Sequence, residues 1–221
     1  MFLDWSIPLK NFGLLATGAG FTLVLTIICF LLSMATGVLF GIGRSVSNNK
    51  PLYFLLTAYI EAIRNTPVLV QIFLIYRGLP QLGIYLSPIA AGIIAMVVNN
   101  TAYIAEIMRS GINSVYKGQW EAAKSIGLTT ADTMISVILP QALRNVFPAL
   151  VNQFILILFG TSLLSAIDVR ELTQVAYILN SETFRTMEIF LFVMVIYYVL
   201  SLICTTILGW VNKKFFPAIH G

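Results

Sequence analysis

The stretch RSGINSVYKGQWEAAKSIGLTTADTMISVILPQALRNVFP, residues 109–148, is the one large polar segment of a chain made mostly of long apolar runs. Residues 120–126 (WEAAKSI) are good helix formers, and Gly127 follows where a left-handed residue would end that helix. Thr129, with Asp132 three residues later, resembles a capping box, so a second helix is predicted from about Ala131 until Pro140. The stretch therefore predicts a helix, a glycine corner and a second helix.

The composition of the 221 residues identifies an integral membrane protein. Hydrophobic residues make up 58% of the chain and charged residues 10%, whereas soluble domains carry about 25% charged residues. The net charge of +4 comes from basic residues scattered at the ends of apolar runs, which indicates membrane topology and not nucleic-acid binding. The two cysteines, Cys29 and Cys204, lie in apolar runs and are interpreted as small buried hydrophobes.

Five segments are apolar and long enough to span a bilayer, which takes about 20 residues. They lie at about 20–43, 52–76, 87–108, 146–167 and 187–211. With the N-terminus outside, the inner segments hold eight basic residues and the outer segments four. The excess of basic residues inside therefore predicts an outer N-terminus, a cytoplasmic C-terminus and a cytoplasmic loop at 109–145.

Local features predict details of three spans. Gly37 and Gly41 have a G-x-x-x-G spacing, which allows close helix packing. Pro67 is expected to kink or break the second segment. Small polar residues surround Gly160, where the fourth helix is expected to loosen.

Two pairs of opposite charges stand three residues apart at helical spacing. Glu61 with Arg64, and Glu106 with Arg109, are expected to form ion pairs that lower the cost of placing charges near the bilayer. Both pairs are interpreted first as structural anchors.

Two lines of polar side chains cross the predicted spans. Such residues are costly against lipid, so they face a polar cavity or bond across the helix bundle, and both alternatives stay open. As a cavity they would carry no fixed charge and would suit an α-amino acid with a neutral or acidic side chain. The loop at 168–188 is predicted to form an outer gate or a docking face. The polar residues are Asn99, Asn100 and Thr101 in the third span and Asn152, Gln153, Thr161, Ser162 and Ser165 in the fourth.

Several chemistries have no motif in this sequence. There is no G-x-x-x-x-G-K-S/T loop for nucleotide phosphates, no H-E-x-x-H and no G-x-S-x-G, and the single histidine is His220. We therefore expect no metal site, no cofactor bound by this chain and no enzymatic activity.

The polar stretch resembles the EAA loop of ABC-transporter membrane subunits. The matching residues are Glu121, Ala122 and Ala123, then Gly127, then Leu139 and Pro140, with Val137 where the family prefers isoleucine. The sequence at residues 103–115 and 118–123 is similar to that of the polar amino acid permeases within that superfamily.

This resemblance implies a single all-α domain, residues 1–221, with five transmembrane helices and the type I ABC importer permease fold. The residues that would couple to two cytoplasmic ATPase subunits, which bind ATP and Mg, are Glu121, Ala122, Ala123, Lys124, Gly127, Leu139 and Pro140. It also implies a second permease subunit, homologous or identical, a periplasmic or extracellular amino-acid-binding protein and a place in the bacterial plasma (inner) membrane. The alternative is an ion-coupled secondary transporter or channel that works without an ATPase, but the short chain shows no internal repeat.

Overall fold

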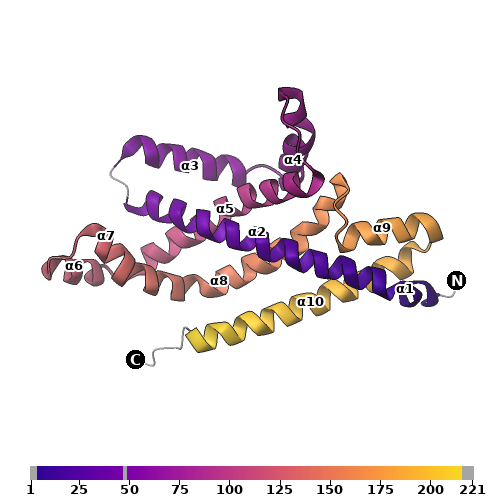
Figure 1. Cartoon of the computed structure of the whole chain (residues 1–221). Helices are drawn as coiled ribbons and strands as arrows, with labels where there is room; N and C mark the ends of the chain where they lie inside the picture. Colours follow the sequence, from indigo (N-terminus) through magenta and orange to yellow (C-terminus); the bar gives the residue numbers. More distant parts are fainter. Residues whose placement is uncertain (1–3, 47–48, 216–221) are drawn as a thin grey trace. The chain divides into compact units, whose positions relative to one another are not determined.

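The structure, a computed structural model, describes residues 4–46 and 49–215, and every regular element in those two ranges is helical (Figure 1). His220 lies outside the described residues. The elements are α1 (Ser6–Lys10), α2 (Phe12–Val46), α3 (Lys50–Arg64), α4 (Val68–Phe73), the π-helix η1 (Leu74–Gly78), the 3₁₀-helix η2 (Leu79–Leu82), α5 (Pro88–Ser114), α6 (Lys117–Ser125), α7 (Thr130–Asp132), the π-helix η3 (Thr133–Ile138), α8 (Leu139–Gly160), the 3₁₀-helix η4 (Thr161–Ile167), α9 (Leu172–Thr183) and α10 (Thr186–Phe215).

Four helical stretches in the described part of the chain are long and apolar enough to cross a membrane. They are Phe12–Val46, Pro88–Ser114, Thr130–Ile167 and Thr186–Lys214. The pair Lys50–Arg64 and Val68–Leu82 makes a fifth if it counts as one broken span. The helices extend beyond the segments predicted from hydropathy; α2, for example, begins at Phe12, eight residues before the predicted start.

The break in the second segment lies at Pro67, as predicted. The backbone N–H of Asn65 still donates to the Glu61 carbonyl, which closes α3, and Pro67 is extended with φ −66° and ψ 130° before α4 starts. The helix was also expected to loosen at Gly160; its geometry does change there, but α8 gives way to the 3₁₀-helix η4, which is wound more tightly than an α-helix. Both breaks follow from local sequence.

The chain divides into two compact units, each described by itself. Unit 1 contains the described residues of Met1–Leu31, Pro67–Val97 and Phe154–Ile207, and unit 2 those of Leu32–Thr66, Val98–Gln153 and Leu208–Gly221.

Unit 1 is built around two apolar clusters. The first joins the first half of α2, α4, the start of α5 and the end of the Thr130–Ile167 helix, through buried residues such as Leu25, Ile72 and Ile157. The second packs α9 against α2 and α10 through Leu15, Leu172 and Ile189. The α9 helix, with 12 residues, is therefore fixed by apolar contacts.

Unit 2 brings the backbones of α2 and α5 together. A Cβ atom added to Gly37 would lie 2.7 Å from Cγ2 of Ile104, and one added to Gly41 would lie 2.7 Å from Cβ of Met108 and 2.9 Å from the Ala105 carbonyl oxygen. The G-x-x-x-G spacing thus serves close helix packing, as predicted.

A Gly41→Ala variant tests this contact. The added methyl group meets backbone as well as a side chain, so we expect overpacking to cost about 1–3 kcal/mol, seen as a lower melting midpoint of the purified permease. Gly20→Ala is the matched control in the same helix, because nothing lies within 4 Å of its added Cβ. Equal melting midpoints for the two variants would contradict the close contact.

Candidate functional site

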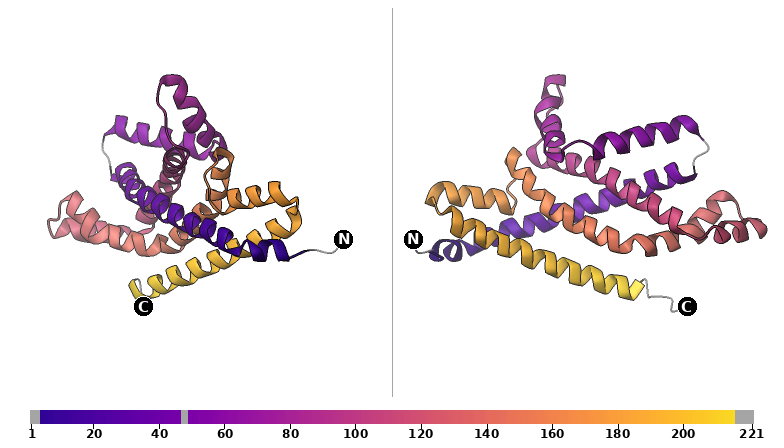
Figure 2. Two further views of the ribbon diagram at one scale, coloured as in Figure 1. Left: turned by 45° about the vertical axis from the view of Figure 1, so that its right-hand side comes forward. Right: turned by 180° about the vertical axis from the view of Figure 1, so that it is seen from behind.

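The polar stretch folds as a helical hairpin within unit 2. Helix α6 contacts η3, and both views in Figure 2 show α6 and α7 folded back on each other between the end of α5 and the start of α8. The predicted helix at 120–126 corresponds to α6, which begins three residues earlier, at Lys117.

Gly127 ends α6 in the predicted conformation, with φ +81°. The N–H of Leu128 donates to the Ala123 carbonyl at 3.1 Å, and the N–H of Gly127 donates to the Lys124 carbonyl at 3.0 Å. These two bonds form a Schellman motif, which closes the carbonyl end of a helix and needs a left-handed residue. The glycine corner predicted from the sequence is confirmed.

The next helix begins as predicted but does not end at Pro140. The Thr129 hydroxyl accepts a bond of 3.1 Å from the N–H of Asp132, which caps α7. The helix then continues through η3 and α8 to Gly160, so the prediction that it stops at Pro140 is wrong. The physical reason is the π-helical turn of η3: its wider spacing shifts the carbonyls that a proline ring would otherwise meet.

One face of α6 is anchored and the other is exposed. Ala123 is buried, and Trp120 packs against a cluster formed by Ile112, Val115, Met134, Ile138 and Ala142, which Leu139 also contacts. Glu121, Ala122, Lys124 and Pro140 are exposed. Helix α6 is thus fixed by the packing of its buried face, while most of the predicted coupling residues are exposed.

Three large apolar side chains near α6 are also exposed, and the sequence reasoning missed them. Tyr116 is 80% exposed, Ile126 77% and Ile135 64%. They lie outside the EAA pattern. Their apolar character inside an otherwise polar stretch is the feature of the sequence that could have indicated them. Because single exposed apolar residues are common but three around one short helix are not, we include them in the candidate docking face of α6.

A cluster of charges joins α2, α3 and α5 in unit 2. The Glu106 carboxylate accepts from Nη1 of Arg44 at 2.6 Å and from Nε of Arg109 at 3.0 Å. Arg44, whose side chain is only 9% exposed, was counted in the sequence only as a topological charge. Because Arg44 is buried, its carboxylate partners stabilise the fold: a buried guanidinium without a partner would be strongly destabilising.

The predicted pairing of Glu61 with Arg64 is corrected by the structure. Glu61 lies 3.9 Å from Nη2 of Arg44, and the Arg64 guanidinium lies over the Tyr103 ring, 5.6 Å from its centroid. The reason is tertiary: the buried Arg44 attracts the carboxylate, and an aromatic face offers Arg64 a cation–π contact. Local spacing carries no information on either partner.

The polar line of α5 meets two partners in unit 2. Nε2 of Gln153 donates to the Asn100 side-chain oxygen at 2.7 Å, and the Thr101 and Thr36 hydroxyls lie 2.6 Å apart. Asn99, Asn100, Thr101 and Gln153 are all buried. Asn100 and Gln153, and Thr101 and Thr36, therefore bond between helices. Thr36 was missed by sequence reasoning because it lies in an otherwise apolar span.

Of the remaining predicted polar residues, Asn152 is exposed in unit 2 and the other three belong to unit 1. The hydroxyls of Thr161, Ser162 and Ser165 donate to the carbonyls of Leu158, Phe159 and Ser162, at 2.8, 2.6 and 2.6 Å. Ser162 lines a cavity of about 350 Å³ together with Thr173 and Tyr197. Hydroxyls that bond within their own helix leave their lone pairs available to such a cavity.

Glu171 is a buried carboxylate that the sequence reasoning placed only in a polar loop. Its oxygens accept from the N–H groups of Gln174 and Thr173 at 2.8 and 2.9 Å and from the Tyr197 hydroxyl at 2.9 Å. It thereby caps α9 and joins it to α10. Burial raises the pKa of the Glu171 carboxyl, and these hydrogen bonds oppose that shift.

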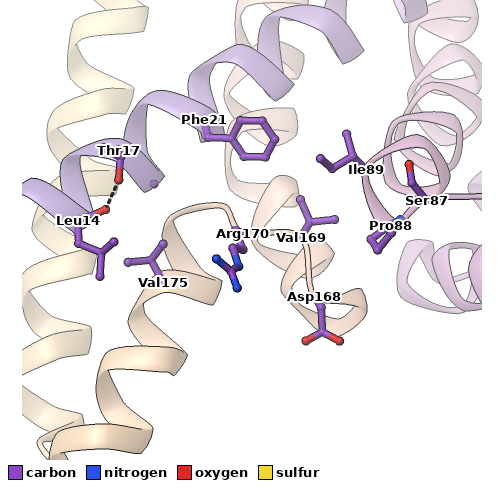
Figure 3. A pocket seen from close by; sticks show the side chains of 11 residues that line it. Leu14, Thr17, Phe21, Ser87, Pro88, Ile89, Asp168, Val169, Arg170 and Val175 are labelled. Atoms are coloured by element: carbon purple, nitrogen blue, oxygen red, sulfur yellow. Dashed lines mark hydrogen bonds between the residues drawn. The ribbon is translucent and has the colours of Figure 1, made fainter.

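A larger cavity of about 590 Å³ lies in unit 1 (Figure 3). It is bounded by the start of α2, the start of α5, and residues 168–170 and 175. Its lining is mainly apolar, but it includes the charged residues Asp168 and Arg170.

Known proteins similar to this chain are membrane transport subunits. The family described as "Binding-protein-dependent transport system inner membrane component" matches residues 33–217. The probable glutamine ABC transporter permease protein GlnM of Bacillus subtilis (strain 168) is 37% identical over 212 residues, covering 96% of this chain and 98% of that protein. The glutamine transport system permease protein GlnP of Escherichia coli (strain K12) is 36% identical over 220 residues, covering 97% and 98%.

A solved structure extends this similarity to three dimensions. A crystal structure of an amino acid ABC transporter with histidines matches with a TM-score of 0.89 and 38% identity, over 97% of this chain and 100% of that chain. The resemblance stated from the sequence, the importer permease fold and the role of a transport subunit instead of an enzyme are confirmed. The chain therefore belongs to the family of binding-protein-dependent transport system inner membrane components, and it is a membrane-spanning permease subunit with the type I ABC importer fold.

Proposed function

We propose that this chain forms the translocation path of an ATP-driven importer for polar amino acids. The observation that carries the substrate class is the near full-length similarity to two glutamine permeases. The polar, uncharged side chains at Asn99, Asn100, Thr101 and Gln153 are consistent with a zwitterionic substrate that has a neutral side chain. The ion-coupled alternative has no observation in its favour.

The coupling site of the proposal is the exposed face of α6. A short helix that ends in a Schellman motif and is packed along one face can move as a rigid body. The small side chain of Ala122 allows a partner to approach closely. Glu121 and Lys124 offer charged groups to a partner, while Tyr116, Ile126 and Ile135 offer apolar surface. The partner is an ATPase subunit that binds ATP and Mg, and two such subunits would face two permease subunits, homologous or identical.

The proposal includes one orientation in the bacterial plasma membrane. The α6 hairpin would face the cytoplasm, with the N-terminus outside and the C-terminus inside, because this arrangement places more basic residues on the inner side. The binding protein, periplasmic or extracellular, would then meet the opposite ends of the helices. The whole chain would act as one permease domain.

ATP-dependent uptake by the complete transporter tests the function. The permease is co-expressed with its ATPase and binding protein, reconstituted in vesicles and supplied with labelled L-glutamine. We expect uptake only when ATP reaches the ATPase side. Uptake that persists without ATP or ATPase would support the ion-coupled alternative and end this proposal.

A Gly127→Val variant tests the coupling role of α6. Valine at φ +81° costs about 1–2 kcal/mol and weakens the Schellman motif, so we expect uptake per ATP hydrolysed to fall severalfold in an assembled complex. Gly83→Val is the matched control, because Gly83 has the same φ of +81° and an equally open Cβ position outside the hairpin. If both variants keep the wild-type ratio of uptake to hydrolysis, the α6 corner has no coupling role.

A Gln153→Glu variant tests the substrate path. A carboxylate beside Asn100 would offer a partner to a cationic side chain, worth about 1–3 kcal/mol. We expect uptake measured against competing amino acids to shift toward arginine and lysine, while Gln81→Glu, at an exposed site, leaves selectivity unchanged. Wild-type selectivity in Gln153→Glu would mean that this polar pair serves packing alone.

A further inference from the structure

The segment 168–171, which we name the strap, joins η4 to α9 in unit 1 and alternates between exposed and buried residues. Val169 is 1% exposed and Glu171 is fully buried. Asp168 and Arg170, between them, are exposed. The strap thus presents two opposite charges on a backbone that is anchored at every second residue.

Hydrogen bonds hold the strap in one conformation. The N–H of Val169 donates to the Leu164 carbonyl at 3.2 Å, and the N–H of Glu171 donates to the Val169 carbonyl at 2.8 Å. The second bond closes a three-residue turn with Arg170 at its centre. Together with the cap that Glu171 forms on α9, these bonds fix the positions from which Asp168 and Arg170 project.

The two charged side chains border the cavity of about 590 Å³. In Figure 3 the Arg170 side chain extends from the strap toward Val175, and the Asp168 carboxylate lies at the outer edge of the strap. Nε2 of Gln174 donates to Oδ1 of Asp168 at 3.1 Å, which limits the motion of that carboxylate. The opposite walls are apolar, formed by Leu14, Phe21 and Ile89.

Fixed opposite charges beside an apolar cavity match the chemistry of a zwitterion. A guanidinium binds a carboxylate through two parallel hydrogen bonds, and a carboxylate accepts from an ammonium group. We propose that this cavity is a second substrate site, in which Arg170 binds the α-carboxylate and Asp168 the α-ammonium group of an amino acid.

The place of this site in transport rests on the proposed function. The cavity is lined by the start of α2 and the start of α5, which are the helix ends that the proposed orientation, with the N-terminus outside, places on the outer side. An amino acid released by the binding protein would meet this cavity first. Because the charges recognise the groups common to all α-amino acids, the site would admit substrates without selecting among their side chains.

Equilibrium binding of labelled L-glutamine to the purified transporter, in phosphatidylcholine nanodiscs without binding protein, tests the site. We expect Asp168→Asn and Arg170→Gln each to weaken binding about tenfold, as loss of a charge-assisted hydrogen bond does. Lys10→Gln and Glu182→Gln, exposed charges that do not line the cavity, should bind like wild type. Basal ATPase activity and the melting midpoint report whether each variant is folded.

Substrate analogues separate direct contact from a structural effect. N-acetyl-L-glutamine lacks the ammonium group, so Asp168→Asn should not weaken its binding further, and L-glutaminamide lacks the carboxylate, so Arg170→Gln should not weaken its binding further. If each substitution weakens the binding of its analogue as much as it weakens the binding of glutamine, the proposal is overturned. It is also overturned if both variants bind glutamine like wild type, or if the wild-type transporter binds no glutamine at millimolar concentration. An effect of the two substitutions only in discs with phosphatidylethanolamine would assign the cavity to a lipid headgroup and overturn it too.

The outcome for this site is separable from that for the proposed function. Wild-type uptake with unchanged glutamine binding in the variants removes the second site and leaves the function. Loss of ATP-dependent uptake in the wild-type transporter removes the function, while the binding assay needs neither ATP nor uptake.

Discussion

A chain that crosses a bilayer has to satisfy its backbone hydrogen bonds within itself, and this constraint shapes each element described above. It accounts for helices of up to 35 residues and for the treatment of their ends. Where a helix begins or ends, another group completes the hydrogen bonding: the Glu171 carboxylate at the start of α9, the Thr129 hydroxyl at the start of α7 and the left-handed Gly127 after the end of α6. The irregular segments, including the strap, are the places where side chains replace helical bonds.

Features set by neighbouring residues could be predicted from the sequence. The Gly127 corner, the Thr129 cap and the break at Pro67 each depend on the conformational limits of one residue and on groups within a few positions. The same is true of the membrane class, which composition alone decides, and of the small-residue contact at Gly41, which a four-residue spacing indicates.

Features set by distant partners could not be predicted in this way. Pairing Glu61 with Arg64 failed because Arg44, on another helix, competes for the carboxylate. The role of Glu171 was hidden for the same reason, since its partner Tyr197 is 26 residues away. Pro140 shows a third kind of failure: a rule about one residue was applied without the π-turn that precedes it and removes the steric conflict.

The contact between α2 and α5 has a mechanical consequence. At Gly37 and Gly41 the side chains of Ile104 and Met108 pack directly on the α2 backbone, so little free space separates the two helices. Helix α5 continues to Ser114, and only two residues separate it from the start of α6. A displacement of the α6 hairpin would therefore act on α5 and, through these tight contacts, on α2, so that the two helices would move together.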